Sequence, residues 1–179
     1  IGQTCEDIDT SGNSYFCTFE PGETCIFENA TNGEDDFDWS ITENGTPSSG
    51  TGPDFAGEGF FYSFIEVSSP RSSNDAAILT TANSVLPDTP FCLRFKYHMK
   101  GIPGDLEILA HGRNEATSYV EWSRSGYQSD KWLTAAVDIQ SFTDPVVEIR
   151  GTRGTSWQGD IAIDGMTLTA GTCAGNGRK

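Results

Sequence analysis

The sequence contains little that would suit a nucleic acid, a membrane or a zinc ion. Of its 179 residues only 11 are Lys or Arg, against 26 Asp or Glu, and the formal net charge is −15. A charge of that sign repels nucleic-acid phosphates and anionic lipid surfaces, so neither is an expected partner. No apolar run approaches the length of a membrane-spanning helix, which argues against direct membrane insertion of this chain.

Soft metal ligands and catalytic motifs are equally scarce. The five cysteines form no CxxC pair, and the only histidines are His98 and His111. A zinc site is therefore not expected, and an exported protein with an oxidised disulfide framework is the better interpretation. No nucleophile elbow, zinc motif or phosphate-binding loop accompanies the many serines, so the sequence predicts a protein without catalytic activity.

What the sequence does contain is a series of short β-strand patterns separated by turn residues. No segment keeps a helical period, and the spacing of the strands is typical of an antiparallel β-sandwich. The predicted strands are Phe60–Val67, Ala76–Thr80, Phe91–Met99, Leu106–Ala110, Tyr119–Trp122, Trp132–Ile139, Val146–Arg150 and Asp160–Thr169.

The chain divides into a polar leader over residues 1–14, a folded domain over residues 15–173 and a flexible tail over residues 174–179. Near the start of the domain, Pro21-Gly22 predicts a turn in a hairpin-like loop that brings Cys17 close to Cys25. A disulfide between them is favoured by proximity, and the other pairings stay open. Further along, Glu43–Gly59 is rich in turn formers and predicts a long irregular loop, which is where recognition often occurs.

Two acidic segments are expected to lie together. In Asp35–Trp39 the aromatic side chains alternate with carboxylates, which places Phe37 and Trp39 on the core face. Gly151–Cys173 comprises a turn, the last strand and a closing cysteine, and we expect it to pair with Asp35–Trp39 to build a cation site. The apolar phase of this strand switches near Asp164-Gly165, which indicates either a bulge at Gly165 or a strand buried on both faces.

Other aromatic residues and two sequons carry weaker predictions. Trp39, Trp122 and Trp132 lie in strand-like runs and are expected in the core, whereas Trp157 lies in a glycine-flanked turn and is expected near the surface. Asn29-Ala-Thr31 and Asn44-Gly-Thr46 are potential glycosylation sites, which agrees with an exported glycoprotein.

The sequence contains, in order, the motifs Cys17-Thr-Phe-Glu20, Asp35–Trp39 and Gly151–Cys173. These and the others given below resemble motifs of the MAM domain, the module named for meprin, neuropilin and receptor tyrosine phosphatases. The resemblance implies a jelly-roll-like sandwich of two antiparallel sheets in which Cys17 pairs with Cys25 and Cys92 with Cys173. Cys5 lies outside the usual set of four, which favours either an intermolecular disulfide or a free thiol. The matching motifs are Cys17-Thr-Phe-Glu20, Cys25, Asp35–Trp39, Thr51–Asp54, Gly59–Tyr62, Cys92-Leu93 with Phe95 and Tyr97–Met99, Trp122–Gly126, Trp132 and Gly151–Cys173.

The acidic residues suggest a structural Ca²⁺ site, because a hard cation takes six or more oxygen ligands. The predicted ligands are Glu20, Asp36, Asp38 and Asp164, with Asp35 as a further contributor. Gly165 stands where the family usually carries a second acidic residue, which predicts weak binding. Na⁺ in the same place and a solvated acidic face without any ion are the alternatives.

The resemblance implies an extracellular interaction module for adhesion or oligomerisation, within a larger secreted or membrane-anchored protein. The expected partner is a protein, either another copy or a different chain, and the contact surfaces are expected at Glu43–Gly59 and Trp157. A carbohydrate-binding module that takes glycans is the main alternative, because jelly-roll sandwiches often bind sugars. A matrix protein that binds many calcium ions through its bulk acidity is the third.

Overall fold

The computed structural model describes residues 14–31 and 33–174, and every regular element in those ranges is a β-strand. The fold is therefore all-β, as the strand pattern predicts, and each predicted strand from Phe60 onward has a counterpart. The strands are β1 (Ser14–Cys17), β2 (Glu28–Asn29), β3 (Ser40–Thr42), β4 (Tyr62–Ile65), β5 (Ala76–Thr80), β6 (Phe91–Met99), β7 (Asp105–Gly112), β8 (Tyr119–Ser125), β9 (Ser129–Ile139), β10 (Pro145–Thr152) and β11 (Ile161–Ala170).

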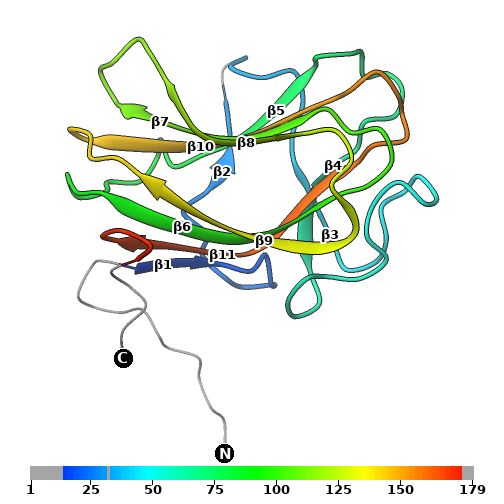
Figure 1. Ribbon diagram of the computed structural model, residues 1–179, viewed down its shortest axis with the longest axis horizontal. Helices are drawn as coiled ribbons and strands as arrows, with labels where there is room; N and C mark the ends of the chain where they lie inside the picture. The colour runs from blue at the N-terminus through cyan, green and yellow to red at the C-terminus, as the bar shows by residue number, and fades with distance from the viewer. Residues whose placement is uncertain (1–13, 32, 175–179) are drawn as a thin grey trace, which may run out of the picture.

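The strands form two antiparallel sheets that pack face to face (Figure 1). One sheet has the order β3-β4-β11-β6-β9, with β1 paired to β11 as its sixth strand, and the other has the order β2-β5-β10-β7-β8. Strands β4 and β1 pair with successive parts of β11: β4 lies opposite Ile161–Ile163, and β1 lies opposite Met166–Thr169. The predicted sandwich of two antiparallel sheets is confirmed.

The core lies between the sheets and follows the two-residue period of the strands. On β6 the odd-numbered side chains from Phe91 to Met99 point inward and are buried, while Arg94 between them is exposed. They meet buried side chains of the facing sheet such as Leu106, Ile108 and Ile149. Packing of this kind fixes the register, because a slip by one residue would turn the apolar side chains to solvent.

Strand β11 contains a bulge and is also buried on both faces, so both explanations for the change in its apolar pattern are correct. Its register against β6 shifts between Asp164 and Thr167, and Gly165 has a φ of 54°. A Cβ atom on Gly165 would lie 2.7 Å from a carboxylate oxygen of Glu58, so only glycine fits without movement. Residues 161–164 are all buried.

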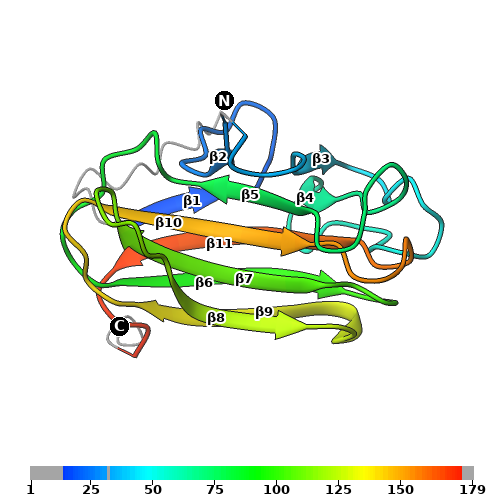
Figure 2. The same ribbon diagram turned by 90° about the horizontal axis from the view of Figure 1, so that it is seen from above.

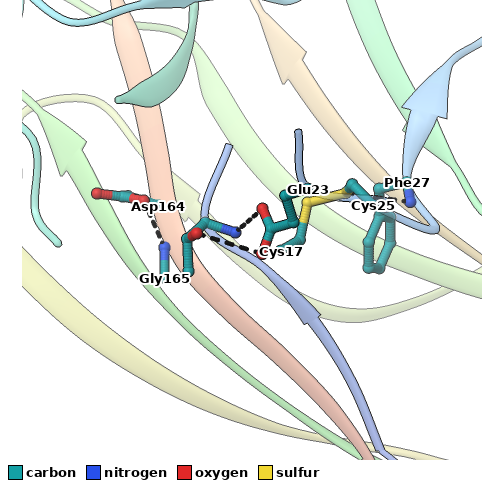
Figure 3. The surroundings of a disulfide bond; sticks show 7 residues. Cys17, Glu23, Cys25, Phe27, Asp164 and Gly165 are labelled. Atoms are coloured by element: carbon teal, nitrogen blue, oxygen red, sulfur yellow. Dashed lines mark hydrogen bonds between the residues drawn. A yellow bond between two sulfur atoms is a disulfide. The ribbon is translucent and has the colours of Figure 1, made fainter. Parts of the chain in front are cut away.

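The predicted N-terminal hairpin is wrong. β1 joins the six-stranded sheet through β11, whereas β2 is a two-residue strand that joins the other sheet through β5. The chain therefore crosses from one sheet to the other between Cys17 and Cys25, and the disulfide between these residues closes the crossing, with the Cα atoms 5.0 Å apart (Figure 3). The apolar residues Cys25–Phe27 suit a buried loop as well as a strand, and Phe27 is indeed buried without being in a strand.

The second disulfide joins Cys92 on β6 to Cys173, three residues after β11 ends, with the Cα atoms 4.8 Å apart. Both bonds are those that the family resemblance implies. This bond ties the end of the last strand to the middle of the six-stranded sheet and closes a loop of 81 residues. Cys5 lies outside the described residues, as do nearly all of the predicted leader and tail.

Candidate interaction site

The acidic segment Asp35–Trp39 lies along β5, not beside β11. A carboxylate oxygen of Asp36 accepts a hydrogen bond from the amide of Ala76 at 2.9 Å, and one of Asp35 accepts from Ile78 at 2.9 Å. Since β5 belongs to the five-stranded sheet and β11 to the other, this segment does not pair with the last strand. Its contact with Gly151–Cys173 is at Gly151 on β10, where a Cβ atom would lie 2.9 Å from the Trp39 ring. The predicted alternation is confirmed: Phe37 and Trp39 are buried while the intervening carboxylates are exposed.

The other two predicted ligands hold a backbone segment near β11. Asp164 is fully buried, and its two carboxylate oxygens accept hydrogen bonds from the amides of Glu58 and Gly165, each at 2.7 Å (Figure 3). Burial raises the pKa of Asp164 to about 6. One oxygen of Glu20 accepts from the amides of Phe60 and Phe61, at 2.6 and 3.0 Å.

The predicted calcium ligands therefore do not form a single site in this structure. Asp36 and Asp38 are exposed and line one shallow polar depression, where Arg71 stacks on Phe37 with its guanidinium carbon 4.4 Å from the ring centroid. Across residues 14–31 and 33–174, no group of three or more His, Cys, Asp or Glu side chains is arranged to hold a metal ion. The set as predicted does not fit a hard cation, and calcium stays a prediction.

The Glu43–Gly59 loop has no regular structure, as predicted, yet it forms a fixed layer over the six-stranded sheet. The indole nitrogen of Trp132 donates a hydrogen bond to the carbonyl of Phe55 at 2.8 Å, and the ammonium of Lys96 donates to that of Gly57 at 2.7 Å. The Tyr62 hydroxyl lies 2.9 Å from the carbonyl oxygen of Pro53, and burial raises its pKa to about 12. The loop thus buries apolar side chains on the outer face of the sheet, and Phe55, at 79% exposure, is its most exposed apolar side chain.

A buried carboxylate missed by the sequence analysis anchors the same loop. Asp160 immediately precedes β11 and is fully buried, with Thr51 Oγ1 2.5 Å from one oxygen and the amide of Val67 donating to the other at 3.1 Å. Burial raises the pKa of Asp160. Nothing in the sequence spacing links a threonine in an irregular loop to an aspartate 109 residues later.

Three loops meet at one end of the sandwich, because β6, β8 and β10 all end there and β7, β9 and β11 begin there. The amide of Ile102 donates to the carbonyl of Gln158 at 2.6 Å, and that of Gly126 donates to Gly104 at 3.0 Å. Exposed apolar side chains come from each loop, and Ile102, Tyr127 and Trp157 are 49%, 58% and 49% exposed. We call these three residues the tip surface. The expectation that Trp157 lies near the surface is confirmed.

The tryptophans expected in the core differ in their burial, and both histidines lie on strands. Trp39 is buried, whereas Trp122 and Trp132 are partly buried and pack against the edges of the apolar clusters. His98 is buried on β6 with its ring centroid 5.7 Å from that of Trp132, and burial lowers its pKa. His111 lies on strand β7, and its Nε2 lies 3.8 Å from the carboxylate of Glu148.

The two sequons differ in their surroundings. The side-chain amide of Asn29 donates to the carbonyl of Trp39 at 3.0 Å, and its oxygen accepts from the amide of Trp39 at 2.8 Å. Asn44 is exposed on the long loop, and its hydrogen bonds to Thr42 and Tyr62 use only its backbone atoms. The Asn29 side chain is thereby held against the Trp39 backbone, while Asn44 is exposed to solvent.

Comparison with known proteins agrees with this architecture. The chain is 38% identical to the MAM domain-containing glycosylphosphatidylinositol anchor protein 1 of Gallus gallus over 167 residues, which is 88% of this chain and 17% of that protein. It is 33% identical to the MAM domain-containing protein 2 of Mus musculus over 162 residues, 89% of this chain and 23% of that protein. The chain thus spans about a fifth of the length of these curated relatives.

Solved structures share this fold at low sequence identity. A cleaved adhesin domain of Lys-gingipain from Porphyromonas gingivalis aligns with a TM-score of 0.63 at 14% identity, covering 89% of this chain and 99% of that one. A xylan-binding domain from Paenibacillus barcinonensis aligns with a TM-score of 0.57 at 11% identity, covering 89% and 94%. The sequence matches the family described as MAM domain, meprin/A5/mu, over residues 17–174, and the chain therefore belongs to the MAM domain family.

Proposed function

We propose that this chain is an interaction module that binds other proteins and has no catalytic role of its own. The observation that carries the proposal is the match to the MAM family across the whole sandwich, from Cys17 to the residue after Cys173. A rigid two-sheet scaffold that presents loops at its ends is suited to recognition, because the loops vary without disturbing the core.

The module lies outside the cell. Two disulfides hold the fold, and disulfides persist in oxidising compartments. Several relatives are named as glycosylphosphatidylinositol-anchored proteins, and each is several times longer than this chain. The described residues contain no helix that is long and apolar enough to cross a bilayer. We infer that the module works as one part of a larger secreted or membrane-anchored protein.

The tip surface is the contact region that the geometry favours. Its three apolar side chains are about half exposed, and they lie on loops that hydrogen-bond to one another. Aromatic residues are enriched in protein interfaces and supply much of the binding energy where they become buried. A surface of this kind suits a protein partner, whether a second copy of the chain or another protein.

Sedimentation velocity over a wide concentration range tests whether the partner is a second copy. A reversible dimer that weakens when Tyr127 and Trp157 are replaced by serine would support self-association through the tip surface. The matched control is Val85→Ser, which changes an exposed apolar side chain outside the tip surface. A strict monomer at every concentration would rule out a second copy and leave a different protein or a glycan as the partner.

Runs in Ca²⁺ and in EDTA address the cation prediction in the same experiment. A dimer or a melting temperature that changes on chelation would support a bound Ca²⁺, whereas a bound Na⁺, which EDTA does not remove, would leave both unchanged. Many weak calcium ions without an effect on association would instead favour the matrix-protein alternative. Identical behaviour in both buffers would count against a structural role for Ca²⁺.

Carbohydrate binding is the second candidate function. Tyr127 and Trp157 are exposed rings of the kind that stack on sugar faces, and the similar folds include a xylan-binding domain and a module solved with β-1,4-galactotriose. The identities to those proteins are 11% and 14%, so the likeness concerns the fold alone. A glycan array on the purified domain, with Trp157→Ser as control, discriminates this function from protein binding.

A further inference from the structure

A small pocket opens on the side of the sandwich where both sheets end. Strands β2 and β3 are the terminal strands of their sheets, and Figure 2 shows them along the same side of the molecule. The pocket between them has a volume of about 200 Å³. We call it the acidic pocket; it is lined by Phe19, Glu20, Glu23, Cys25, Phe27, Glu28, Asn29, Trp39, Ile41, Ser63 and Leu79.

The floor of the acidic pocket is apolar and fixed. Phe19, Phe27, Trp39 and Leu79 are buried members of the main core. The Trp39 indole nitrogen donates a hydrogen bond to the carbonyl of Ala77 at 3.0 Å, and the Trp39 backbone is bound on both sides by the Asn29 amide. The pocket is therefore already formed, and a ligand would not need to order its walls first.

The rim carries negative charge that no cation neutralises. Glu20, Glu23 and Glu28 line the opening, and none of the salt bridges formed by residues 14–31 and 33–174 involves them. Glu23 accepts hydrogen bonds from the amide and the hydroxyl of Thr18 at 2.6 and 3.2 Å, which fixes its position beside the disulfide (Figure 3). Glu28 is exposed on β2 and accepts from the Asn83 side chain at 2.7 Å.

We propose that the acidic pocket binds the side chain of a lysine or arginine presented by a basic segment of another protein. This inference rests on the proposed function and names the chemistry of the partner. Long basic side chains lay an aliphatic stem on apolar surface and keep the charged head near the polar rim. Here the stem would lie against Ile41 and Leu79 while the head meets the carboxylates of Glu23 and Glu28.

The size of the pocket agrees with this ligand. Small-molecule and cofactor sites usually measure about 300–1,000 Å³, so a pocket of about 200 Å³ suits one side chain better than a whole cofactor or an oligosaccharide. Charge also decides between partners. At this pocket the three glutamates would repel an acidic segment and attract a basic one.

Titration of the isotopically labelled domain with the capped peptide acetyl-Gly-Arg-Gly-amide, followed by NMR, tests the proposal. Acetyl-Gly-citrulline-Gly-amide is the matched ligand, because citrulline keeps the shape of arginine without its charge. We expect saturable shifts at Trp39, Ile41 and Leu79 with the arginine peptide, and much weaker ones with the citrulline peptide. Weak affinity is expected because a single side chain buries little area.

Glu28→Gln should weaken the arginine peptide by about two- to fivefold, the usual effect of one exposed charge pair, and Glu28→Lys should weaken it further. Glu28 is exposed, so neither change should disturb the fold. Glu115→Gln, an exposed glutamate outside the acidic pocket, should leave binding unchanged. The proposal for the pocket would be overturned if the arginine peptide did not shift the NMR signals of Trp39, Ile41 and Leu79, or if the citrulline peptide bound equally well. Protein binding at the tip surface would remain open in either case.

The reverse result separates the two claims as well. If the peptide binds as expected but the whole domain engages no protein partner on cells, the pocket stands and the proposed function fails.

Discussion

Thr51 Oγ1 lies 2.5 Å from a carboxylate oxygen of Asp160 and 2.7 Å from the carbonyl oxygen of Ser48. One hydroxyl proton cannot serve both acceptors. The Thr51 hydroxyl therefore donates to one of these two oxygens at a time, and burial raises the pKa of the Asp160 carboxyl. The contact joins the long loop to the start of the last strand, so it fixes the layer that covers the six-stranded sheet.

Thr51→Val should therefore destabilise the domain. Valine has nearly the same shape but no hydroxyl, so the buried Asp160 carboxyl loses a partner, which costs about 1–3 kcal/mol. The free energy of unfolding from urea denaturation is the measurement. Thr117→Val, at an exposed position, should stay within about 0.5 kcal/mol of the wild type. Equal stabilities of the two variants would show that the contact does not hold the loop.

The two disulfides should contribute unequally. The Cys92–Cys173 bond closes a loop of 81 residues and the Cys17–Cys25 bond one of 8, which the loop-entropy model converts to about 4–5 and about 2–3 kcal/mol. Replacing Cys92 and Cys173 together by alanine should lower the midpoint of denaturation more than replacing Cys17 and Cys25. The opposite order would mean that native packing around the short crossing outweighs chain entropy.

The buried His98 should make stability depend on pH. Burial lowers its pKa in the folded state, although the carboxylates of Asp54 and Asp130 oppose that effect and Lys100 adds to it. Below the unfolded pKa of about 6.5, the unfolded chain therefore binds a proton at His98 more readily than the folded chain does. The contribution of His98 to the free energy of unfolding is complete above that pH and is lost as the pH falls below it.

His98→Phe tests this dependence. Phenylalanine keeps a ring against Trp132 but cannot take up a proton, so the loss of unfolding free energy between pH 7.5 and pH 5 should be smaller in the variant. Parallel pH profiles for the two proteins would show that His98 titrates alike in the folded and unfolded states.

The sequons should be occupied unequally in a glycosylating host. Asn44 presents a free side-chain amide on an exposed loop, whereas the Asn29 amide is bound to the backbone of Trp39 from both sides. Peptide mass mapping should find glycan on Asn44 and little on Asn29. Full occupancy at Asn29 together with a normally folded domain would contradict this assignment.

The alternation of apolar and polar residues predicted the strands and the faces on which their side chains lie. The buried Phe37 and Trp39 and nearly all strands after Phe60 follow from the two-residue period, which reports directly on the faces of a sheet. The changed phase near Gly165 likewise marked a real bulge. The cysteine pairing came from the family resemblance, since spacing alone left Cys92 and Cys173 undecided.

Long-range placement was not predictable from such patterns. The sequence shows that Asp36 and Asp164 are acidic and flank apolar residues. It does not show that Asp36 contacts β5 of one sheet while Asp164 lies on β11 of the other. The Thr51–Asp160 contact and the acidic pocket depend on how separate loops and sheet edges meet, which no local period encodes. The family resemblance therefore predicted the fold, but it did not predict which residues form these contacts and the pocket.

The most direct test of the account uses the glycosylated domain, biotinylated at one end and assembled on streptavidin, with binding to cultured cells as the readout. The account predicts binding that is lost when the cells are treated with trypsin and that survives treatment with glycosidases. Tetramers with serine at Tyr127 and Trp157 should bind less than the wild type. Binding that resists trypsin and disappears with glycosidases would contradict the account and identify a carbohydrate-binding module instead.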